Sequence, residues 1–483
     1  MTVSLNLGFL WKSEDIEGNV LVPRYYDPEL RRVISRLRPT HELVRFGELI
    51  DTGEVQVDTG DEIGKMAYGT GEIPFVRTSD IGNWELRADP KQAVSEAIYD
   101  QYSKDQDVRA GDIFFVRDGT YLVGNACILT RCDRKLLYQS HILKFRVAPD
   151  ARLTPEFLLA LLSSPLVRRQ IFTKRLTADI IDTLGNRYRE LILPIPKDRD
   201  LVRTVSTRVG SIVESRSRFR EILRDLPSHI ESRGGTSRYS ANEEAPSGIP
   251  LRLGFLVKTP ELHGNVLVPR AYDPSIRHRL DALRSTHDLV TIGSLVLDSK
   301  LELVTGIEVG KMAYGTGPIP FIRTSDITNW ELSIDPKQTI SEDLCKINDF
   351  PVDTRPGDIL LVRDGTYLIG TSCVITDSDP MIVFASGLYR IRAIGPNAVD
   401  PYLLWVLLNC QLVQRQFRAV QFTRDVIDTI GRRILDVILP IPKSPKVRES
   451  IVESARKSVE TRARLRNESV TLANSLAGSA SQP

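Results

Sequence analysis

The chain has 483 residues, of which 41% are hydrophobic and 26% are charged, and its formal net charge is +2. This length supplies material for two to four globular domains, while so small a net charge neither requires nor excludes nucleic acid. The sequence shows neither a long apolar run nor a charged, apolar and small-residue leader, which predicts a cytoplasmic protein without a membrane span. The five scattered cysteines are typical of reduced thiols and of neither a zinc cluster nor a disulfide framework.

The chain is an internal duplication with a constant offset of 246 residues. Residues 65–86 return almost unchanged as 311–332, and residues 111–124 return as 357–370. Because this period is far too long for a solenoid repeat, each copy is expected to be a domain. The predicted boundaries are a first domain over 1–197, a helix over 198–230, a linker over 231–250, a second domain over 251–443, a second helix over 444–476 and a disordered tail over 477–483.

The first regular element is a short helix that begins at Asp27-Pro28 and continues to Leu37, with apolar residues at intervals of three and four. An extended lead-in over residues 5–27 precedes it. The other face of this helix carries arginines. Two interpretations of them stay open, a solvated helix face and a face that contacts phosphates. The arginines concerned are Arg31, Arg32, Arg36 and Arg38.

A β-rich region follows, because the apolar residues now come in short β-branched and aromatic runs separated by glycine and aspartate. A polar, glycine-rich loop is expected between the first two strands. The run at 111–116 is too short for a helix and predicts a fully buried strand, which ends at Asp118-Gly119, a tight-turn dipeptide. The strands predicted in the first copy cover 43–46, 73–77, 111–116, 121–130 and 143–147.

The end of each copy turns helical and then extended. Residues 155–162 open with proline and an acid, as helices do, and a second helix is predicted over 165–174. In the second copy Gln411 replaces that proline, so the helix there can run on unbroken. A capped turn at 179–183 and a Leu-Pro-Ile-Pro segment at 193–196 complete the copy. The prolines of this segment lack the donors of a central strand, so it is predicted to be an edge strand or a linker.

A long amphipathic helix is predicted after each copy, with a heptad-like apolar seam. Arg216 interrupts the first seam, and Arg462 stands at the equivalent place in the second. The seam favours pairing of the two helices with each other, although packing of each helix on its own domain stays open. Pro227 ends the first helix, and residues 232–250 have the composition of an exposed linker. The seam positions are Val205, Val209, Ile212, Phe219, Leu223 and Leu226, with Ile451, Ala455, Ser458, Leu465, Ser469 and Leu472 in the second copy.

A search for catalytic or metal-binding groups favours a binding protein over an enzyme. The sequence contains neither a Walker loop, nor a dinucleotide fingerprint, nor a Gly-x-Ser-x-Gly elbow. Only His41 and His287 correspond between the copies, and no histidine pair is spaced for a metal on one helical face. We therefore predict no catalytic residue and no metal ligand in this chain. Aspartates 179, 182, 425 and 428 fit capped turns, and Asp80, Asp112 and Asp118, which have arginine neighbours, fit structural salt bridges.

The order of these elements resembles the DNA specificity subunit of type I restriction-modification enzymes. The motifs that carry the resemblance are Tyr-Asp-Pro at 26–28, Val-Arg-Phe-Gly at 44–47, Ile-Pro-Phe-Val-Arg-Thr-Ser-Asp-Ile at 73–81, Gly-Asp-Ile-Phe-Phe-Val-Arg-Asp-Gly at 111–119 and Leu-Pro-Ile-Pro at 193–196. Each motif has a counterpart 246 positions later. In place of the family's usual helix start, Lys-Asp-Arg-Asp stands at 197–200 and Lys-Ser-Pro-Lys at 443–446.

The resemblance implies an α+β fold with two tandem target recognition domains, each a mixed sheet with helices, joined by two long antiparallel helices. It implies a subunit without catalytic activity that reads a bipartite site in double-stranded DNA, one half with each domain. Two copies of a DNA adenine methyltransferase subunit would supply S-adenosylmethionine binding, so no cofactor is expected in this chain. A translocating restriction subunit is a further partner in such complexes.

The residues expected to contact DNA lie in the loop at 65–71, after the second strand and at a hairpin tip at 117–121, because these places offer hydrogen-bonding groups beside rigid strands. Arginine and asparagine can contact base edges, while lysine and threonine contact the backbone; Arg77 and Arg117 can equally be scaffold. The predicted residues are Lys65, Tyr68, Thr70, Arg77, Asn83, Arg117, Thr120 and Tyr121, with Lys311, Tyr314, Thr316, Arg323, Asn329, Arg363, Thr366 and Tyr367 in the second copy.

The two copies differ most across 87–110 against 333–356 and across 131–138 against 377–384. If the matching loops read the bases, the half-sites should be nearly identical and inverted; if the diverging segments do so, the target should be asymmetric. Two functions compete with DNA recognition. One is a scaffold of a phage-defence complex with the same fold that does not read sequence. The other is a nuclease at the aspartate-rich loops, for which no Pro-Asp with a following Glu-x-Lys is present.

Overall fold

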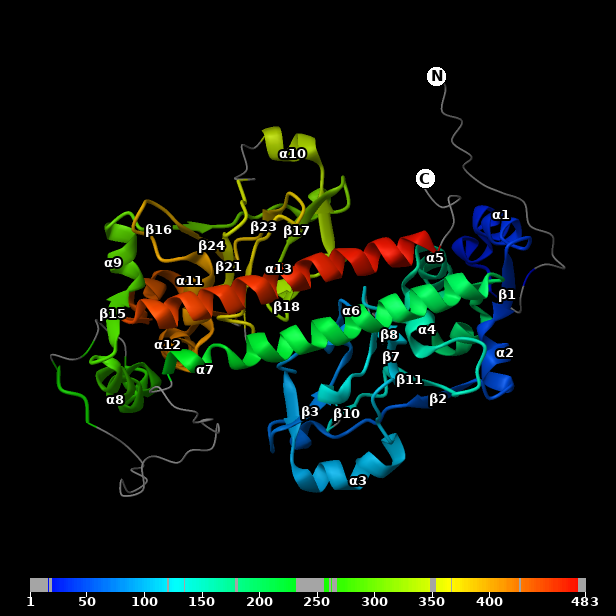
Figure 1. Ribbon diagram of the computed structural model, residues 1–483, viewed down its shortest axis with the longest axis horizontal. Coiled ribbons are helices and arrows are strands. Elements are labelled where there is room, and N and C mark those ends of the chain that lie inside the picture. Colours follow the sequence, from blue (N-terminus) through cyan, green and yellow to red (C-terminus); the bar gives the residue numbers. More distant parts are fainter. Residues whose placement is uncertain are drawn as a thin grey trace. The chain divides into compact units, whose positions relative to one another are not determined.

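The computed structural model describes residues 20–231 and 267–476, apart from 120, 134, 179–180, 348–352, 366 and 425–426, and in addition 16, 256–259 and 262. The chain divides into two compact units, Met1–Glu214 with Glu468–Pro483, and Ser215–Asn467. Each unit contains one copy of the duplication and part of both long helices (Figure 1). Most of the predicted lead-in, the linker over 232–250 and the tail over 477–483 lie outside the described residues. In the described residues, no helix has both the length and the apolar character that crossing a bilayer requires.

The first unit is built from short helices around small sheets. Its helices are α1 (Pro28–Arg36), α2 (Phe46–Asp51), α3 (Glu96–Gln106), α4 (Pro155–Ser163) and α5 (Pro165–Lys174), with 3-10 turns η2 (Pro23–Tyr26), η3 (Lys65–Ala67), η4 (Thr78–Asp80), η5 (Arg131–Asp133) and η6 (Gly185–Glu190). Its strands are β1 (His41–Arg45), β2 (Val55–Thr59), β3 (Ile73–Val76), β4 (Ile81–Gly82), β5 (Glu85–Leu86), β6 (Gln92–Val94), β7 (Ile113–Val116), β8 (Asp118–Gly119), β9 (Ala126–Ile128), β10 (Leu137–Tyr138), β11 (Ile142–Val147), β12 (Leu176–Ala178), β13 (Ile181–Thr183) and β14 (Ile192–Pro196).

The central sheet of this unit is antiparallel, with the strand order β2-β11-β7-β9. The predicted strand at 111–116 is confirmed as β7, whose four residues are all buried. A second sheet of order β10-β3-β6 pairs β3 with β10 in parallel, and α3 packs beside β10 (Figure 1). The Leu-Pro-Ile-Pro segment is confirmed as an edge strand, since β14 pairs only with β1.

Helices α4 and α5 cover the core, as predicted. Thr154 and Ser164 cap them, because each side-chain oxygen accepts a hydrogen bond from a backbone N–H in the first helical turn. Residues 157–162 of α4 are fully buried, which is why this helix is apolar on every side. Its Phe157 belongs to the same apolar cluster as Phe115 and Phe145 of the central sheet.

Three local predictions in the first copy are wrong. The region between the first two predicted strands is not only a loop, because it contains α2 and β2, whose Phe46 and Val55 are buried. Asp118-Gly119 is not the tight turn: it forms β8 and pairs with β13. The chain turns instead where the Asn125 N–H donates to the Leu122 carbonyl (2.9 Å), so the return strand β9 is short. Residues 181–183, predicted as part of a capped turn, form β13 in a hairpin with β12.

The second unit repeats this plan. Its helices are α7 (Ser228–Glu231), α8 (Pro274–Leu283), α9 (Ile292–Leu297), α10 (Glu342–Ile347), α11 (Pro401–Asn409) and α12 (Gln411–Val420), with η8 (Pro269–Tyr272), η9 (Lys311–Ala313), η10 (Thr324–Asp326) and η11 (Gly431–Asp436). Its strands are β15 (His287–Thr291), β16 (Leu301–Thr305), β17 (Ile319–Ile322), β18 (Ile327–Thr328), β19 (Glu331–Leu332), β20 (Gln338–Ile340), β21 (Ile359–Val362), β22 (Ser372–Val374), β23 (Val383–Phe384), β24 (Leu388–Ala393), β25 (Phe422–Arg424), β26 (Ile427–Thr429) and β27 (Ile438–Pro442).

The expectation of an unbroken helix near Gln411 is also wrong. Helix α11 ends at Asn409 because Cys410 has an extended backbone, with φ −68° and ψ 150°. The Gln414 side-chain amide donates to the Leu408 carbonyl (2.8 Å) at the end of α11 and to the Gly370 carbonyl (3.0 Å). These side-chain hydrogen bonds satisfy backbone groups at the break, so no proline is needed for the chain to bend there.

Two long helices, α6 (Arg199–Asp225) and α13 (Pro445–Ser475), follow the two copies. Every seam residue predicted from the sequence is buried except Leu472, which is half-buried. In the first unit Val205 and Val209 of α6 belong to the same apolar cluster as Ala473 of α13. In the second unit the Arg216 guanidinium donates to the Arg462 carbonyl (2.9 Å), and the Arg462 guanidinium donates to the Arg216 carbonyl (2.7 Å). The two helices thus contact each other within each unit.

Candidate nucleic-acid interface

The loop at 65–71 in the first unit is rigid and exposes two side chains. The Thr70 hydroxyl donates to the Ala67 carbonyl (2.7 Å) and accepts from the Ser95 N–H (3.1 Å). The ring of Tyr68, half-buried, packs on Phe75 with 5.6 Å between centroids. Lys65 and Met66 at the tip point into solvent, and the Met66 side chain is 91% exposed.

The loop at 311–317 in the second unit has the same internal geometry. The Thr316 hydroxyl donates to the Ala313 carbonyl (2.7 Å) and accepts from the Ser341 N–H (3.1 Å). The Tyr314 ring packs on Phe321 at 5.9 Å, and Met312 is again 91% exposed. Gly69 and Gly315 both have φ 73°, a conformation that favours glycine. The chain therefore builds the same loop twice, with the same two exposed side chains.

Four residues predicted to contact DNA have internal roles in these loops. The hydroxyls of Thr70 and Thr316 hold the loop closed, and the rings of Tyr68 and Tyr314 pack on the sheet below. The ammonium groups of Lys65 and Lys311 form neither an ion pair nor a hydrogen bond within the described residues. Of the predicted residues in each loop, the lysine is thus the one that has neither a hydrogen bond within the loop nor a ring packed on the sheet, and it lies next to a methionine that the sequence did not single out.

Arg77 and Asn83, with their counterparts Arg323 and Asn329, lie in a turn region rather than at a tip. The Arg77 N–H donates to the buried carboxylate of Asp80 (2.9 Å). Burial raises the pKa of Asp80 above its ordinary value, although the hydrogen bond from Arg77 opposes this shift. Asn83 and Trp84 have φ 50° and 65°, which are the left-handed values of a tight turn between β4 and β5. Asparagine tolerates this conformation, so the turn accounts for its presence without a ligand.

Arg117 pairs with the next residue instead of extending from a hairpin tip. Its guanidinium lies 2.8 Å from the Asp118 carboxylate and donates to the Ser140 carbonyl (3.1 Å). Burial raises the pKa of Asp118, but hydrogen bonds from Arg117, Thr183 and His141 outweigh it and hold the pKa below its ordinary value. In the second unit Arg363 pairs with Asp364 at 3.0 Å.

The other predicted residues of this region have different environments. The tyrosines Tyr121 and Tyr367 are exposed, at 37% and 45%. Thr120 and Thr366 lie outside the described residues. Direct contact of these residues with DNA stays a prediction.

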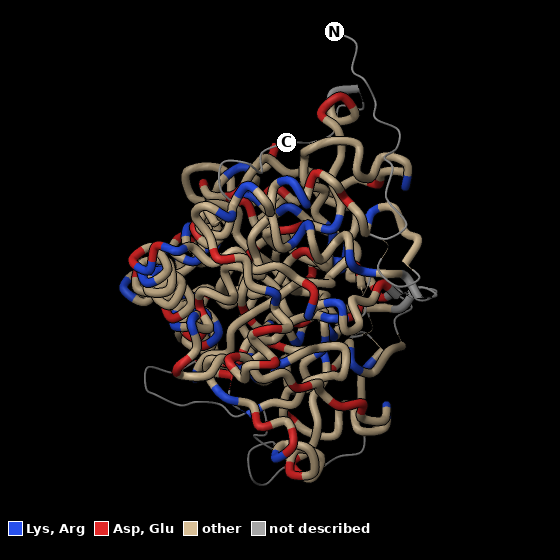
Figure 2. The backbone as a smooth tube through the Cα atoms, turned by 90° about the vertical axis from the view of Figure 1, so that its right-hand side faces the viewer, with Lys and Arg blue, Asp and Glu red and all other residues tan. Residues whose placement is uncertain are grey.

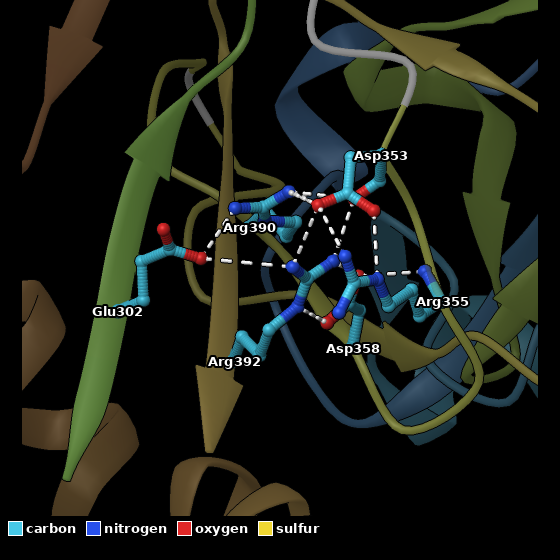
Figure 3. Close-up of polar contacts among 6 residues, drawn as sticks. All are labelled: Glu302, Asp353, Arg355, Asp358, Arg390 and Arg392. Carbon is cyan, nitrogen blue, oxygen red and sulfur yellow. Dashed lines mark hydrogen bonds and ion pairs between the residues drawn. The ribbon is translucent and has the colours of Figure 1, made fainter. Parts of the chain in front are cut away.

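The diverging segments return to the sheet at a network of charges that the sequence did not predict as a group. In the second unit Arg392 binds both carboxylate oxygens of the buried Asp358, at 2.7 and 2.8 Å, and lies 2.9 Å from Asp353 (Figure 3). In the first unit Arg146 binds Asp112 and Asp107 in the same way, at 2.7 Å each. Hydrogen bonds from Arg109 and Arg146 lower the pKa of Asp107 to about 2. Both diverging segments therefore end at the same ionic anchor.

The arginine face of α1 is exposed and is only partly repeated in the second unit, where Arg277 and Arg284 correspond to Arg31 and Arg38. Pro28, Arg31, Arg32, Ser35 and Arg36 line a shallow hollow, and Arg32 pairs with Glu29 at 3.1 Å. The positions equivalent to Ser35 and Arg36 are Asp281 and Ala282 in α8. Both interpretations of this face, solvated and phosphate-contacting, stay open.

Basic and acidic residues are interspersed along the described chain (Figure 2). In the described residues, no group of three or more histidine, cysteine, aspartate or glutamate side chains is placed to hold a metal ion. The arrangement that both units share is an exposed loop with one cation and one apolar side chain at its tip.

No family model matches the chain, and no curated protein matches it. Among solved structures, the type I restriction-modification S subunit from M. genitalium is similar with a TM-score of 0.29 and 12% identity, over 92% of this chain and 96% of that chain. The HsdS subunit from Thermoanaerobacter tengcongensis has a TM-score of 0.27 and 15% identity, over 92% and 96%. A structure of a type I R-M system, described for its assembly and conformational transition, has a TM-score of 0.28 and 16% identity, over 92% and 98%. At these values the similarity carries no argument about function, which rests on the chain's own residues.

Proposed function

We propose that this chain is a non-catalytic DNA sequence-specificity subunit of a type I restriction-modification complex. The sequence motifs at 73–81 and 111–119, each with a counterpart in the second copy, support this assignment. In this proposal each copy reads one half of a bipartite site, and α6 and α13 fix the distance between the halves. Two copies of an adenine methyltransferase subunit, which bind S-adenosylmethionine, dock on the chain.

The observation that carries the proposal is the exposed Lys-Met pair, which occurs at the same place in both copies. An exposed side chain contributes little to stability, so stability does not explain why Met66 and Met312 are identical. Several other exposed positions have changed. Alanine replaces Arg36, proline replaces Glu72, and aspartate replaces Arg131 in the second copy. A shared ligand that both loops touch explains the identity of the pair.

Duplex DNA suits such a loop better than a protein surface does. A protein interface needs an apolar centre built from several side chains, whereas Met66 is followed by alanine and flanked by the charged Lys65. On DNA a lysine contacts phosphate, and an apolar side chain contacts the methyl group of thymine in the major groove. The two strands of a duplex are related by twofold symmetry, so two equivalent loops can make equivalent contacts on the two half-sites.

The test is to co-express the chain with an adenine methyltransferase subunit from the same genome and to sequence the methylated adenines. We expect one bipartite motif, with near-identical inverted half-sites if the retained loops read the bases. Two unrelated half-sites would move base reading to the diverging segments at 87–110 and 333–356. Methylation that does not depend on this chain would overturn the proposed function itself.

Variants of the loop separate its two side chains. Lys65→Ala should weaken binding to all sequences alike and reduce the slope of log affinity against log salt by about 1, as expected for one lost phosphate contact. Met66→Gln should instead reduce the selectivity for the base at one position, in one half-site only. Met312→Gln should reduce the selectivity at the equivalent position of the other half-site. Lys457→Ala, which removes an exposed lysine of α13, is the matched control and should leave both properties unchanged.

The competing function is a scaffold of a phage-defence complex that does not read sequence. The internal ion pairs of Arg117 with Asp118 and of Arg363 with Asp364 favour structural roles for these two arginines. If Arg117→Ala and Arg363→Ala prevent assembly of the complex but leave DNA selectivity unchanged, the scaffold role gains support. Loss of selectivity in an assembled complex supports the specificity subunit.

A further inference from the structure

A cluster of buried charges lies in the second unit, where the two long helices meet the hairpin of β18 and β19. Glu331 of β19 lies 2.5 Å from the guanidinium of Arg216 on α6 and 3.5 Å from that of Arg462 on α13. The side chains of Arg216 and Arg462 are each 1% exposed, and that of Glu331 is 7% exposed. One carboxylate of the recognition domain therefore contacts a buried cation from each helix.

The two arginines also hold the helices to each other. Arg216 donates to the Arg462 carbonyl (2.9 Å), and Arg462 donates to the Arg216 carbonyl (2.7 Å). A slip of α6 along α13 by one residue would displace these atoms by about 1.5 Å and would break both hydrogen bonds. The pair is thus compatible with one register of the two helices.

A second contact holds the same domain to α13. Arg466, one turn after Arg462, lies 2.7 Å from the carboxylate of Asp379 and donates to the Leu332 carbonyl (3.2 Å). The side chains of Arg466 and Asp379 are 4% and 2% exposed. The hairpin that contains Glu331 and the loop that contains Asp379 are therefore both attached to one helix through buried charges.

Stability alone does not explain this cluster. Burial raises the pKa of Glu331, but the guanidinium groups of Arg216, Arg462 and Arg466 outweigh it and lower the pKa below its ordinary value. Even a well-paired buried charge bears a desolvation penalty, and apolar residues of similar volume often give equal or greater stability. What apolar residues do not supply is a unique register, which buried polar groups can specify.

The first copy supplies the equivalent residue at each of these positions. Glu85, Arg216 and Arg220 are the counterparts of Glu331, Arg462 and Arg466, and all are buried. Two of the three residues between these arginines have changed, from Ser217 to alanine and from Phe219 to leucine, while the exposed Arg218 recurs as Arg464. The buried charges have been kept while two of their neighbours varied.

We propose that Glu331 is a positioning residue that fixes the second recognition domain on the helix pair, and with it the number of base pairs between the two half-sites. This inference rests on the proposed function. The argument is geometric: successive base pairs are about 3.4 Å apart, so a domain free to slip by one or two helical residues would accept sites one base pair longer or shorter. The bases within each half-site would still be read, because the described ion pairs of Glu331 join its hairpin to Arg216 and Arg462 of the two helices.

The test is methylation by the complex of the Glu331→Gln chain with the adenine methyltransferase subunit, on a library of sites that differ only in spacer length. We expect the preferred half-site bases to stay the same and methylation of sites one base pair longer or shorter to rise about tenfold, the discrimination that one mismatch ordinarily provides. Retention of the single native spacer by a folded Glu331→Gln complex would overturn the proposal.

Glu331→Gln leaves two buried arginines without a carboxylate partner, which by itself can unfold the chain. A second variant avoids this by removing all three charges. In the triple variant Arg216→Met, Arg462→Met and Glu331→Leu, apolar side chains replace all three charges, so the fold should be kept while the spacer relaxes. A triple variant with wild-type stability and an unchanged spacer would show that the cluster does not set the distance.

The matched control is the double variant Arg218→Met and Arg464→Met, which changes the exposed arginine of each helix and should leave the spacer alone. If the wild-type complex shows no bipartite motif at all, the proposed function fails instead, and that outcome is distinct from a change of spacer.

Discussion

The two copies differ most in a segment that leaves the sheet after β5 or β19 and returns at β7 or β21. In the first copy this segment contains α3, of 11 residues, and the amide of Gln106 at its end bonds the Tyr138 backbone at 2.9 and 3.0 Å. In the second copy the residues that follow α10 (Glu342–Ile347) lie outside the described part of the chain, and valine stands at the sequence position of that glutamine. Both segments nevertheless return to an arginine of the central sheet, Arg146 or Arg392. The fold thus fixes where the segment ends and leaves its course free to vary.

A buried cation two residues before the anchor arginine, Lys144 or Arg390, keeps a carboxylate partner in both copies although the sequence of the opposite strand has changed. In the first copy Lys144 is 1% exposed and lies 3.0 Å from Asp58, which is directly opposite it in the sheet. In the second copy Arg390 stands at the same place, but the residue opposite is Val304. The carboxylate has moved two residues along the strand to Glu302, 2.5 Å from Arg390 (Figure 3). The longer side chain of Arg390 reaches Glu302, which is diagonal to it on the neighbouring strand, whereas Lys144 finds its carboxylate directly opposite.

The largest effect should come from removing the arginine at the end of either segment. Arg392→Met leaves Asp358 buried without its ion pair, and Arg146→Met does the same to Asp112. Each change should lower the free energy of unfolding by about 3–5 kcal/mol, the usual cost of breaking a buried pair from one side. Urea denaturation would measure it. Arg355→Met is the control, because this arginine is 65% exposed and should cost at most about 1 kcal/mol. Equal effects in the control and in Arg392→Met would contradict a special role for the anchor.

A smaller effect should follow from moving the carboxylate in the first copy to its place in the second. Asp58→Val removes the partner of the buried Lys144 ammonium, which keeps its hydrogen bonds to the Gln106 and Asp107 carbonyls. Since Asp58 is 51% exposed, we expect a loss of roughly 1–2 kcal/mol in the free energy of unfolding.

The compensation can be tested directly in the Asp58→Val background. Adding Gln56→Glu together with Lys144→Arg should recover most of the loss, because this combination reproduces the second copy. Gln56→Glu without Lys144→Arg should recover less, since the lysine is too short for the diagonal. Full recovery by Gln56→Glu alone would show that reach is not what distinguishes the two copies.

Elements with local signals were predictable from the sequence, and elements defined by distant partners were not. Strand β7 and helices α4 and α5 follow from a short apolar run or from a capped proline start, and all three are present. Asp118-Gly119 resembles a turn locally, yet β13, more than 60 residues away in the sequence, pairs with it and draws it into a sheet. Likewise the helix break at Cys410 is accompanied by hydrogen bonds from Gln414 to the Leu408 and Gly370 carbonyls, and no proline in the sequence marks this break.

The candidate site was predictable to the same extent. The loop at 65–71 was recognisable as exposed and repeated, so its lysine was identified. That the Tyr68 ring packs on Phe75 and that the Thr70 hydroxyl accepts from the Ser95 N–H depend on positions that only the folded chain defines. Met66 could have been found from one signal, an apolar residue kept at an exposed position of both copies. Arg216 and Arg462 were noticed as interruptions of a seam, but their shared partner Glu331 lies on a strand far away in the sequence.

The smallest expected effect is a pH-dependent loss of stability on removing the charge of Asp107, the more exposed of the two carboxylates that Arg146 binds. Hydrogen bonds from Arg109 and Arg146 lower the pKa of Asp107 from 3.8 to about 2, and Asp353 is shifted in the same direction by Arg392 and Arg355. Because the pKa is lower in the folded chain, the ionised Asp107 stabilises the fold above the unfolded-state pKa of about 4, and this contribution is lost as the pH falls toward about 2.

Asp107→Asn should therefore be less stable than the wild type at pH 7, and the difference should shrink between about pH 4 and pH 2. Urea denaturation at several pH values would measure this, with Asp105→Asn, on an exposed carboxylate of α3, as the control. Asp353→Asn should show the same dependence if the anchor works alike in both copies. A destabilisation of Asp107→Asn that stays constant down to pH 2 would mean that its amide disturbs the packing of the loop, and that the charge of this outer carboxylate contributes little beside that of the buried Asp112.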